Sequence, residues 1–222
     1  MSSEQQAMLV KIRELSEERT QASIDHWLQF SNMGTWQFWV SVVALIFPLA
    51  VLLIYLDRRR TFEILFFGFV VHVLMNYLDA YGVANGLVEH PYIIIPGMPI
   101  NLAINTALIP VLFMLTYQYC INQSRNVYFF GLIAAVFTGL VLGGLATATE
   151  FLHLFKGMNI WYIFVIDYLE FVLAYWLTSF FLKIGNQDLN RKEGNQAITS
   201  PRKRQIRYDF FRKKREAGGG AS

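Results

Sequence analysis

The chain has 222 residues, of which 55% are hydrophobic and only 16% are charged, and its mean hydropathy is +0.36. This composition is more apolar than that of ordinary soluble domains, so it favours a membrane protein. No repeat of about 20 to 50 residues is present, which excludes solenoids and arrays. The single cysteine, Cys120, cannot form an internal disulfide and belongs to no metal-spaced motif.

The first 35 residues are polar and acidic, with five Asp or Glu against three Lys or Arg. The segment Glu4–Phe30 contains no proline or glycine. Apolar residues recur in it at roughly helical spacing: Met8, Ile12, Leu15 and Ala22. We predict that residues 1–35 form an external amphipathic helix that lies on the outer membrane surface or packs on a partner, with a solvated helix as the alternative.

Five stretches after this segment are long and apolar enough to cross a bilayer, which takes about 20 residues for a core of roughly 30 Å. They are residues 36–56, 62–81, 101–121, 127–148 and 160–182. We therefore predict an all-α integral membrane protein with a bundle of five transmembrane helices over residues 36–184. Residues 185–222 are predicted to be a disordered, basic cytoplasmic tail.

The basic residues orient the predicted bundle, because Lys and Arg of short loops stay on the cytoplasmic side. The loop at 57–60 reads DRRR, the loop at 122–126 contains Arg125, and residues 183–222 hold eleven basic against four acidic residues. The loop at 82–100 has no Lys or Arg. Five spans place all the basic segments on one side, so we predict the N-terminus outside and the C-terminus in the cytoplasm.

The loop between the second and third predicted spans is unusually apolar and contains the sequence HPYIIIPGMPIN, residues 90–101. Its three prolines prevent a continuous helix, whereas its isoleucines do not fit an ordinary exposed loop. We predict a loop that folds back over the mouth of the bundle. A short re-entrant segment is the alternative.

Polar residues interrupt the second and fifth spans. His72, Asn76 and Asp79 fall within an arc of about 60° on one helix face. Buried charges in hydrocarbon are costly and usually face partners inside the bundle. Equal depths predict that His72 pairs with Glu170 and that Asn76 pairs with Asp167. We expect one polar cluster in the outer half of the bundle.

This predicted cluster provides candidate ligands for a small molecule, an ion or a proton relay. The candidates are His72, Asn76, Asp79, Asn105, Asp167 and Glu170. His72, Asp167 and Glu170 are also the candidate ligands of a divalent metal, the one cofactor that the sequence indicates. The alternative is that polar side chains only join helices, each through a hydrogen bond worth about 0.6 to 2 kcal/mol. For Asn101, Asn105 and Gln118 we favour that structural role.

Small residues recur every four positions in the fourth span and predict close helix packing, within the chain or with a second copy. The stripe consists of Gly131, Ala135, Gly139, Gly143 and Thr147.

Basic residues of the tail are predicted to contact anionic lipid, each worth about 1 kcal/mol near the surface, and nucleic acid is not expected as a partner. They are Arg202, Lys203, Arg204, Arg212, Lys213, Lys214 and Arg215.

The run LDRRRTFEILFFGFVVHVLMNYLDAYG, followed by a proline-punctuated loop and IPVLFMLTYQY, resembles a family of small multi-spanning membrane proteins of spore-forming Gram-positive bacteria. The resemblance covers roughly residues 50–120. It implies a protein of the bacterial cytoplasmic membrane. Because that family has no established activity, the resemblance transfers no catalytic residue.

These observations lead us to expect a non-enzymatic multi-pass membrane protein. It would be a small-ligand or ion-binding component of transport, or an accessory subunit of a membrane complex that binds a membrane protein partner. One alternative is a membrane-embedded, metal-dependent enzyme that uses His72, Asp167 and Glu170. The other alternative is a purely structural scaffold.

Overall fold

The computed structural model of the protein describes residues 1–199, which are mostly helical. The chain divides after Leu177 into two units. Apart from the last part of α7, the elements discussed below belong to the first unit, Met1–Leu177.

The described elements are α1 (Ser3–Phe30), α2 (Trp36–Tyr55), α3 (Thr61–Ala84), β1 (Val88–Glu89), the π-helical segment η1 (Ile104–Leu108), α4 (Ile109–Asn122), α5 (Val127–Ala135), the π-helical segment η2 (Val136–Leu142), α6 (Gly143–Ala148), β2 (His153–Leu154) and α7 (Ile160–Thr199). The segments η1 and α4 form one continuous helix, and α5, η2 and α6 form another.

Five helices are long and apolar enough to cross a membrane by length and composition. They are Trp36–Tyr55, Thr61–Ala84, Ile104–Asn122, Val127–Ala148 and Ile160–Gly185. Each coincides with a predicted stretch to within a few residues. The sequence therefore predicted the number and the position of these helices correctly.

The helices of the bundle expose many large apolar side chains and bury several polar side chains beside an apolar core. Phe47, Leu53, Ile54, Phe62 and Phe69 are between 61% and 81% exposed. The polar residues that are at most 7% exposed include Asn101, Asn105, Thr138, Asp167 and Glu170. So many large exposed apolar side chains together with buried carboxyl groups are unusual for a soluble protein.

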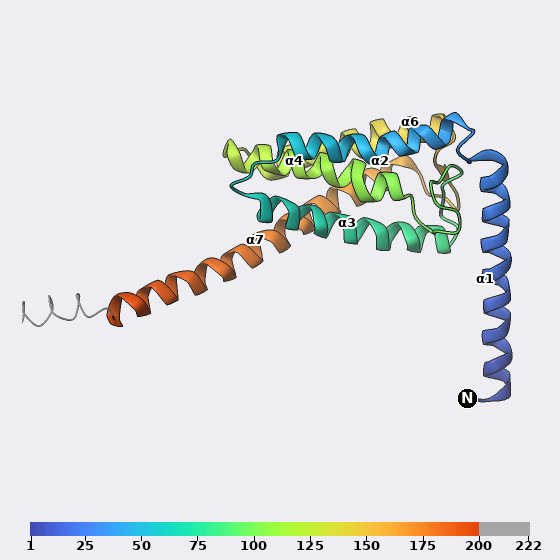
Figure 1. The fold of residues 1–222 in the computed structure, drawn as a ribbon, viewed down its shortest axis with the longest axis horizontal. Helices are drawn as coiled ribbons and strands as arrows, with labels where there is room; N and C mark the ends of the chain where they lie inside the picture. The colour runs from blue at the N-terminus through green and yellow to red at the C-terminus, as the bar shows by residue number, and fades with distance from the viewer. Residues whose placement is uncertain (200–222) are drawn as a thin grey trace, which may run out of the picture. The chain divides into compact units, whose positions relative to one another are not determined.

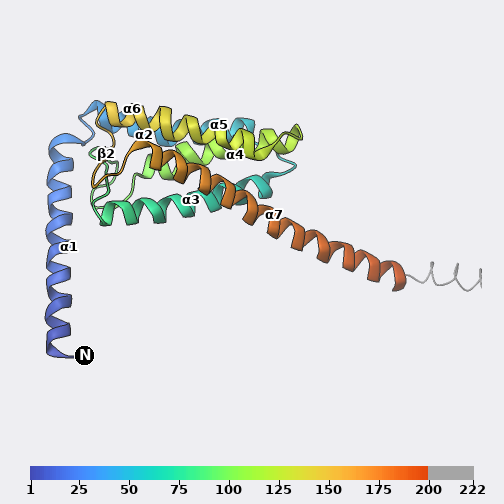
Figure 2. The same ribbon diagram turned by 180° about the vertical axis from the view of Figure 1, so that it is seen from behind.

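The centre of the bundle is filled where α3 and α4 run side by side, as the two opposite views show (Figures 1 and 2). The rings of Phe67 and Tyr117 stack with centroids 4.4 Å apart, and both side chains are almost completely buried. Phe171 of α7 meets the edges of Phe67 and Phe113. These aromatic contacts join α3, α4 and α7 in one core.

The small-residue stripe on α5, η2 and α6 faces α7. A Cβ atom added at Gly139 would come within 2.4 Å of the Phe164 Cα atom, so the two helix backbones touch. Gly131 leaves room for the ring of Phe171, where an added Cβ would meet ring carbon Cε1 at 2.4 Å. Within the described residues, the neighbour of the stripe is thus a helix of the same chain, and an absent side chain permits the approach.

Three more members of the stripe have different surroundings. Ala135 is fully buried, and a Cβ atom added at Gly143 would meet the side chain of Ile160 at 2.9 Å. Thr147 is exposed, and its hydroxyl donates to the carbonyl oxygen of Gly143 within the helix.

The tail differs from the prediction in its described part. Residues 185–199, which we expected to be disordered, continue α7. They contain no proline, so nothing in the backbone ends the helix there. The predicted lipid-contact residues, from Arg202 to Arg215, lie outside the described residues.

We expect the substitution Gly139→Leu to destabilise the bundle by about 1–3 kcal/mol or more, because the new side chain would force α7 away from η2. Thermal unfolding in detergent measures the effect as a lower midpoint. Gly144→Leu is the matched control, since a Cβ atom at Gly144 meets nothing within 4 Å. Equal midpoints for the two variants would show that the close approach at Gly139 does not stabilise the bundle.

Candidate functional site

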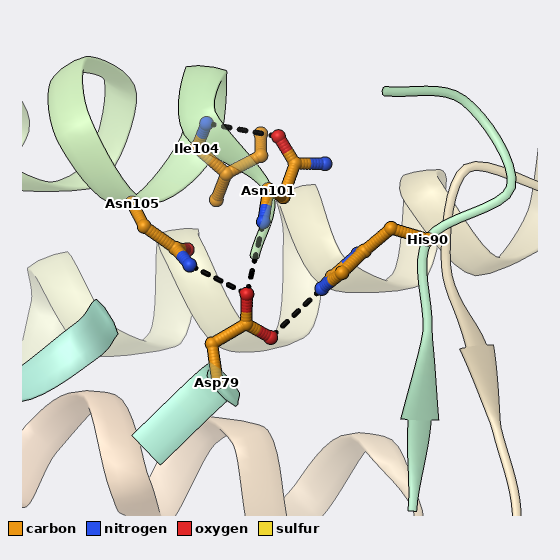
Figure 3. Close-up of polar contacts among 5 residues, drawn as sticks. All are labelled: Asp79, His90, Asn101, Ile104 and Asn105. Atoms are coloured by element: carbon orange, nitrogen blue, oxygen red, sulfur yellow. Dashed lines mark hydrogen bonds and ion pairs between the residues drawn. The ribbon is translucent and has the colours of Figure 1, made fainter. Parts of the chain in front are cut away.

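The Asp79 carboxylate, near the end of α3, is the centre of a polar cluster at one end of the bundle (Figure 3). Its Oδ1 atom accepts a hydrogen bond from His90 Nε2 at 2.8 Å. Its Oδ2 atom accepts from the Asn101 backbone N–H at 3.0 Å and from Asn105 Nδ2 at 2.6 Å. The side chains of Asp79 and His90 are only 12% and 11% exposed. Both carboxylate oxygens are therefore satisfied away from solvent.

The hydrogen bond from Asn101 places this carboxylate at the start of a helix. Asn101 precedes the helical residues that lead into η1, and its own side-chain Oδ1 accepts from the Ile104 N–H at 3.2 Å. The first N–H groups of a helix have no partner within the helix. An anion near these groups is stabilised by the helix dipole. The hydrogen bonds of Asp79 and Asn101 thus together determine where the helix begins.

The π-helical segment η1 leaves one carbonyl group free at the site. In this segment the Ile109 N–H bonds to the Ile104 carbonyl, five residues earlier. The same pattern would pair Asn105 with Pro110, which has no N–H. The Asn105 carbonyl instead pairs with His72 Nδ1 at 3.0 Å. The proline therefore explains why a histidine of α3 contacts the backbone of the next span.

The ring nitrogen Nδ1 of His72 has a second neighbour, because it also lies 3.0 Å from Asn76 Nδ2. The carbonyl oxygen of Asn105 only accepts and the Asn76 amide nitrogen only donates, so these two contacts compete for one ring nitrogen. Asn76 Nδ2 donates to the His72 backbone carbonyl at 2.6 Å. The Oδ1 atom of Asn76 is buried and has no hydrogen-bond partner. Asn76, the middle residue of the polar stripe on α3, thus has one unused acceptor inside the bundle.

Two further carboxyl groups come from α7. Asp167 Oδ2 accepts a hydrogen bond from the Thr138 hydroxyl at 2.6 Å, and both residues are buried. Glu170 is 2% exposed, and its Oε2 atom has no hydrogen-bond partner. The carboxyl groups of Asp167 and Asp79 lie within electrostatic range of Glu170. Three acidic side chains from two helices therefore share one interior region, which we call the acidic cluster.

No basic side chain of the surrounding helices balances this cluster. Residues 61–84, 104–122, 127–148 and 160–177 contain no Lys or Arg. Among the described residues, only the His90 imidazole forms an ion-pair contact with one of the three acids, Asp79. An uncompensated charge in an apolar interior is unfavourable. The acidic cluster therefore has an electrostatic preference for a cation or a proton.

The structure pairs the predicted site residues differently from the depth argument. His72 pairs with Asn105 instead of Glu170, and Asp167 pairs with Thr138 instead of Asn76. The predicted pairs were wrong because depth fixes the level of a side chain but not the helix that faces it. In the described part of the chain, no group of three or more His, Cys, Asp and Glu side chains is placed to hold a metal ion. His72, Asp167 and Glu170 thus do not form such a group.

Two functional partners were missed in the sequence. His90 opens the proline-rich loop, and its position between β1 and Pro91 was the available signal for a contact with Asp79. Thr138 lies one position before a glycine of the small-residue stripe, and its hydroxyl reaches Asp167 from η2. Both π-helical segments thus supply a polar partner to the cluster, as such irregular turns often do at functional sites.

The opposite end of the bundle has its own polar contacts. The Tyr117 hydroxyl donates to Glu63 Oε1 at 2.7 Å. In the loop after α2, the Arg59 backbone N–H donates to Asp57, and this hydrogen bond lowers the pKa of the Asp57 carboxyl. The Glu63 and Tyr117 pair is separate from the acidic cluster. The buried rings of Phe67 and Phe171 lie in the apolar core of the bundle.

We expect Asp79→Ala to lower the free energy of unfolding by at least about 2 kcal/mol, because three buried donors lose their acceptor. Thermal unfolding in detergent measures the loss. Amide hydrogen exchange at Asn101, whose N–H loses its partner, should become faster at the same time. Glu89→Ala is the control, since the Glu89 and His153 contact is long, at 3.6 Å, and exposed. An unfolding midpoint unchanged by Asp79→Ala would contradict the role of Asp79.

Comparison with known proteins adds nothing to this description of the site. No family model matches the chain, and no curated protein and no solved structure matches it. The function is therefore inferred from the residues of the site and from the distribution of polar and apolar side chains over the bundle.

Proposed function

We propose that this protein is a multi-pass membrane protein that takes up a proton or a small cation at the Glu170 carboxyl of the acidic cluster and acts as a component of transport. In this proposal the five apolar helices cross the bacterial cytoplasmic membrane, with the N-terminus outside and the basic C-terminal tail inside. The acidic cluster then lies in the outer half of the bundle. The resemblance to the membrane proteins of spore-forming bacteria is part of the same proposal.

The membrane placement is supported by length and by side-chain distribution. Five helices have the length and hydropathy of membrane spans. Large apolar side chains such as Leu53 and Phe62 are exposed on them, while the acids are buried. Lipid tails accept such an exterior at no cost, whereas water does not.

The single observation that carries the binding proposal is the unpartnered carboxyl of Glu170. A carboxyl group that only joins helices would hydrogen bond to a neighbour, as Asp167 does with Thr138. The Oε2 atom of Glu170 is buried without such a bond. Its surroundings contribute two further carboxyl groups. A small cation or a proton provides the positive charge that this region lacks.

Transport fits the location better than a stable structural ion. The acidic cluster lies next to the end of the bundle, where Asp79 contacts the loop at 90–101. Ionisable groups inside membrane bundles generally mark the paths of ions, protons or charged substrates. A site close to one end and buried in protein has the position from which a cation is taken up or released.

We expect Glu170→Gln to reduce cation uptake by at least about tenfold, because the neutral amide removes one of the three charges that attract the ion. The assay uses purified protein in liposomes. Radioactive sodium and rubidium report alkali ions, and an enclosed pH-sensitive dye reports protons. Glu89→Gln is the matched control, since Glu89 is exposed and has only a long contact of 3.6 Å with His153.

Uptake that is the same in wild type, Glu170→Gln and empty liposomes for all three probes would contradict the proposal. Asp167→Asn separates charge from folding, because the amide can still accept from the Thr138 hydroxyl. We expect it to reduce uptake while it leaves the unfolding midpoint close to that of the wild type.

A further inference from the structure

We propose that residues 90–101 are a lid over the acidic cluster and that the C-terminal part of α1 holds this lid closed. The inference concerns access to the site and rests on the proposed function for its biological meaning. Its geometry stands on contacts that are independent of which cation is bound.

Both ends of the lid converge on a single acid. His90, the first lid residue, donates to one oxygen of Asp79, and the backbone N–H of Asn101, the last, donates to the other (Figure 3). Asp79 is also in electrostatic range of Glu170. The carboxylate that anchors the lid therefore belongs to the cluster that the lid covers.

The middle of the lid is held by side chains of α1. Ser31, directly after α1, both donates to the Ile93 carbonyl and accepts from the Ile93 N–H, each at 3.1 Å. Trp27 Nε1 donates to the same carbonyl at 3.1 Å. One turn earlier, Ser23 Oγ accepts from the Gly97 N–H at 3.1 Å. These three residues are four positions apart, so they lie on one face of the helix.

The lid itself has few interactions that would hold it closed without α1. It contains no regular secondary structure, and none of residues 90–100 is buried. Gly97 has a φ of +82°, which a tight turn requires and which glycine adopts without strain. A segment with little burial and few internal hydrogen bonds opens at a low free energy. The contacts with α1 and Asp79, together with the Tyr92 ring 4.9 Å from the Phe151 ring, therefore determine whether it is open or closed.

Opening of the lid breaks a defined set of bonds. The loss of the contacts from Ser23, Trp27 and Ser31 leaves the middle of the segment held by the ring contact of Tyr92 with Phe151, while the ends remain attached next to Asp79. Because α1 has no buried residue, its packing opposes such a movement only weakly. Movement of α1 and entry of an ion would therefore be coupled.

A reversible lock tests the lid. The substitutions Ser31→Cys and Ile93→Cys place two thiols where a hydrogen-bonded contact exists, in a background with Cys120→Ser. A water-soluble carbodiimide with an amine nucleophile labels accessible carboxyl groups, and mass spectrometry reads the labelling of Glu170. We expect labelling to be at least about tenfold slower with the disulfide formed than after reduction. Labelling of Glu63, at the other end of the bundle, is the internal reference and should not change.

A second experiment tests the contacts of Trp27 and Ser31 with the lid without a disulfide. Trp27→Phe combined with Ser31→Ala should accelerate both the labelling of Glu170 and amide exchange at Ile93. Trp39→Phe is the matched control, because Trp39 donates to the Met33 carbonyl and not to the lid. Equal rates of Glu170 labelling in the oxidised and reduced forms of the cysteine variant and in the variant with Trp27→Phe and Ser31→Ala would overturn the lid proposal.

The outcomes separate the lid from the proposed function. If the rate of Glu170 labelling is the same with and without the disulfide while uptake still depends on Glu170, the lid proposal is wrong and the binding site stands. If the lock controls labelling while Glu170→Gln leaves uptake unchanged, the lid stands and the cation site is wrong.

Discussion

The arrangement at the end of the bundle depends on the need of one buried carboxylate, Asp79, for hydrogen-bond donors. A carboxylate removed from water must have its oxygens satisfied by the protein. Here the donors come from three places in the chain: a loop histidine, the start of a helix and an amide one turn further along. By collecting them, Asp79 determines where the loop begins and ends and where the third apolar helix starts. The two ends of the loop at 90–101 and the start of the helix that follows it are consequences of this single requirement.

Two departures from regular α-helix supply the remaining geometry. In η1, Pro110 removes the N–H that would have paired with Asn105, and His72 takes its place. In η2, Thr138 reaches across to Asp167, next to a glycine whose missing side chain lets the two helices touch. Irregular backbone is tolerated inside an apolar bundle only where other groups satisfy it. The polar side chains therefore hydrogen bond to the backbone of the irregular segments and also form the site.

Much of the fold could be predicted from the sequence, but the pairing of the polar residues could not. Apolar runs of about 20 residues locate helices, because length and hydropathy are properties of a continuous segment. The prolines of residues 90–101 indicated a folded-back loop for an equally local reason. Pairing is different: it depends on helix rotation and on which neighbour lies opposite. Equal depth therefore led to Glu170 as the partner of His72, whereas Pro110 had already made the Asn105 carbonyl the available partner.

The two acids of α7 differ in how their carboxyl oxygens are satisfied. Asp167 has a hydroxyl partner on the adjacent helix, so a hydrogen bond between helices satisfies its Oδ2 atom. Glu170, one turn away and as deeply buried, has an oxygen for which the surrounding helices provide no donor. A neutral Gln or Leu would fill the same volume at less electrostatic cost in an apolar interior. Packing between helices therefore does not by itself account for a carboxyl group kept there beside two other acids.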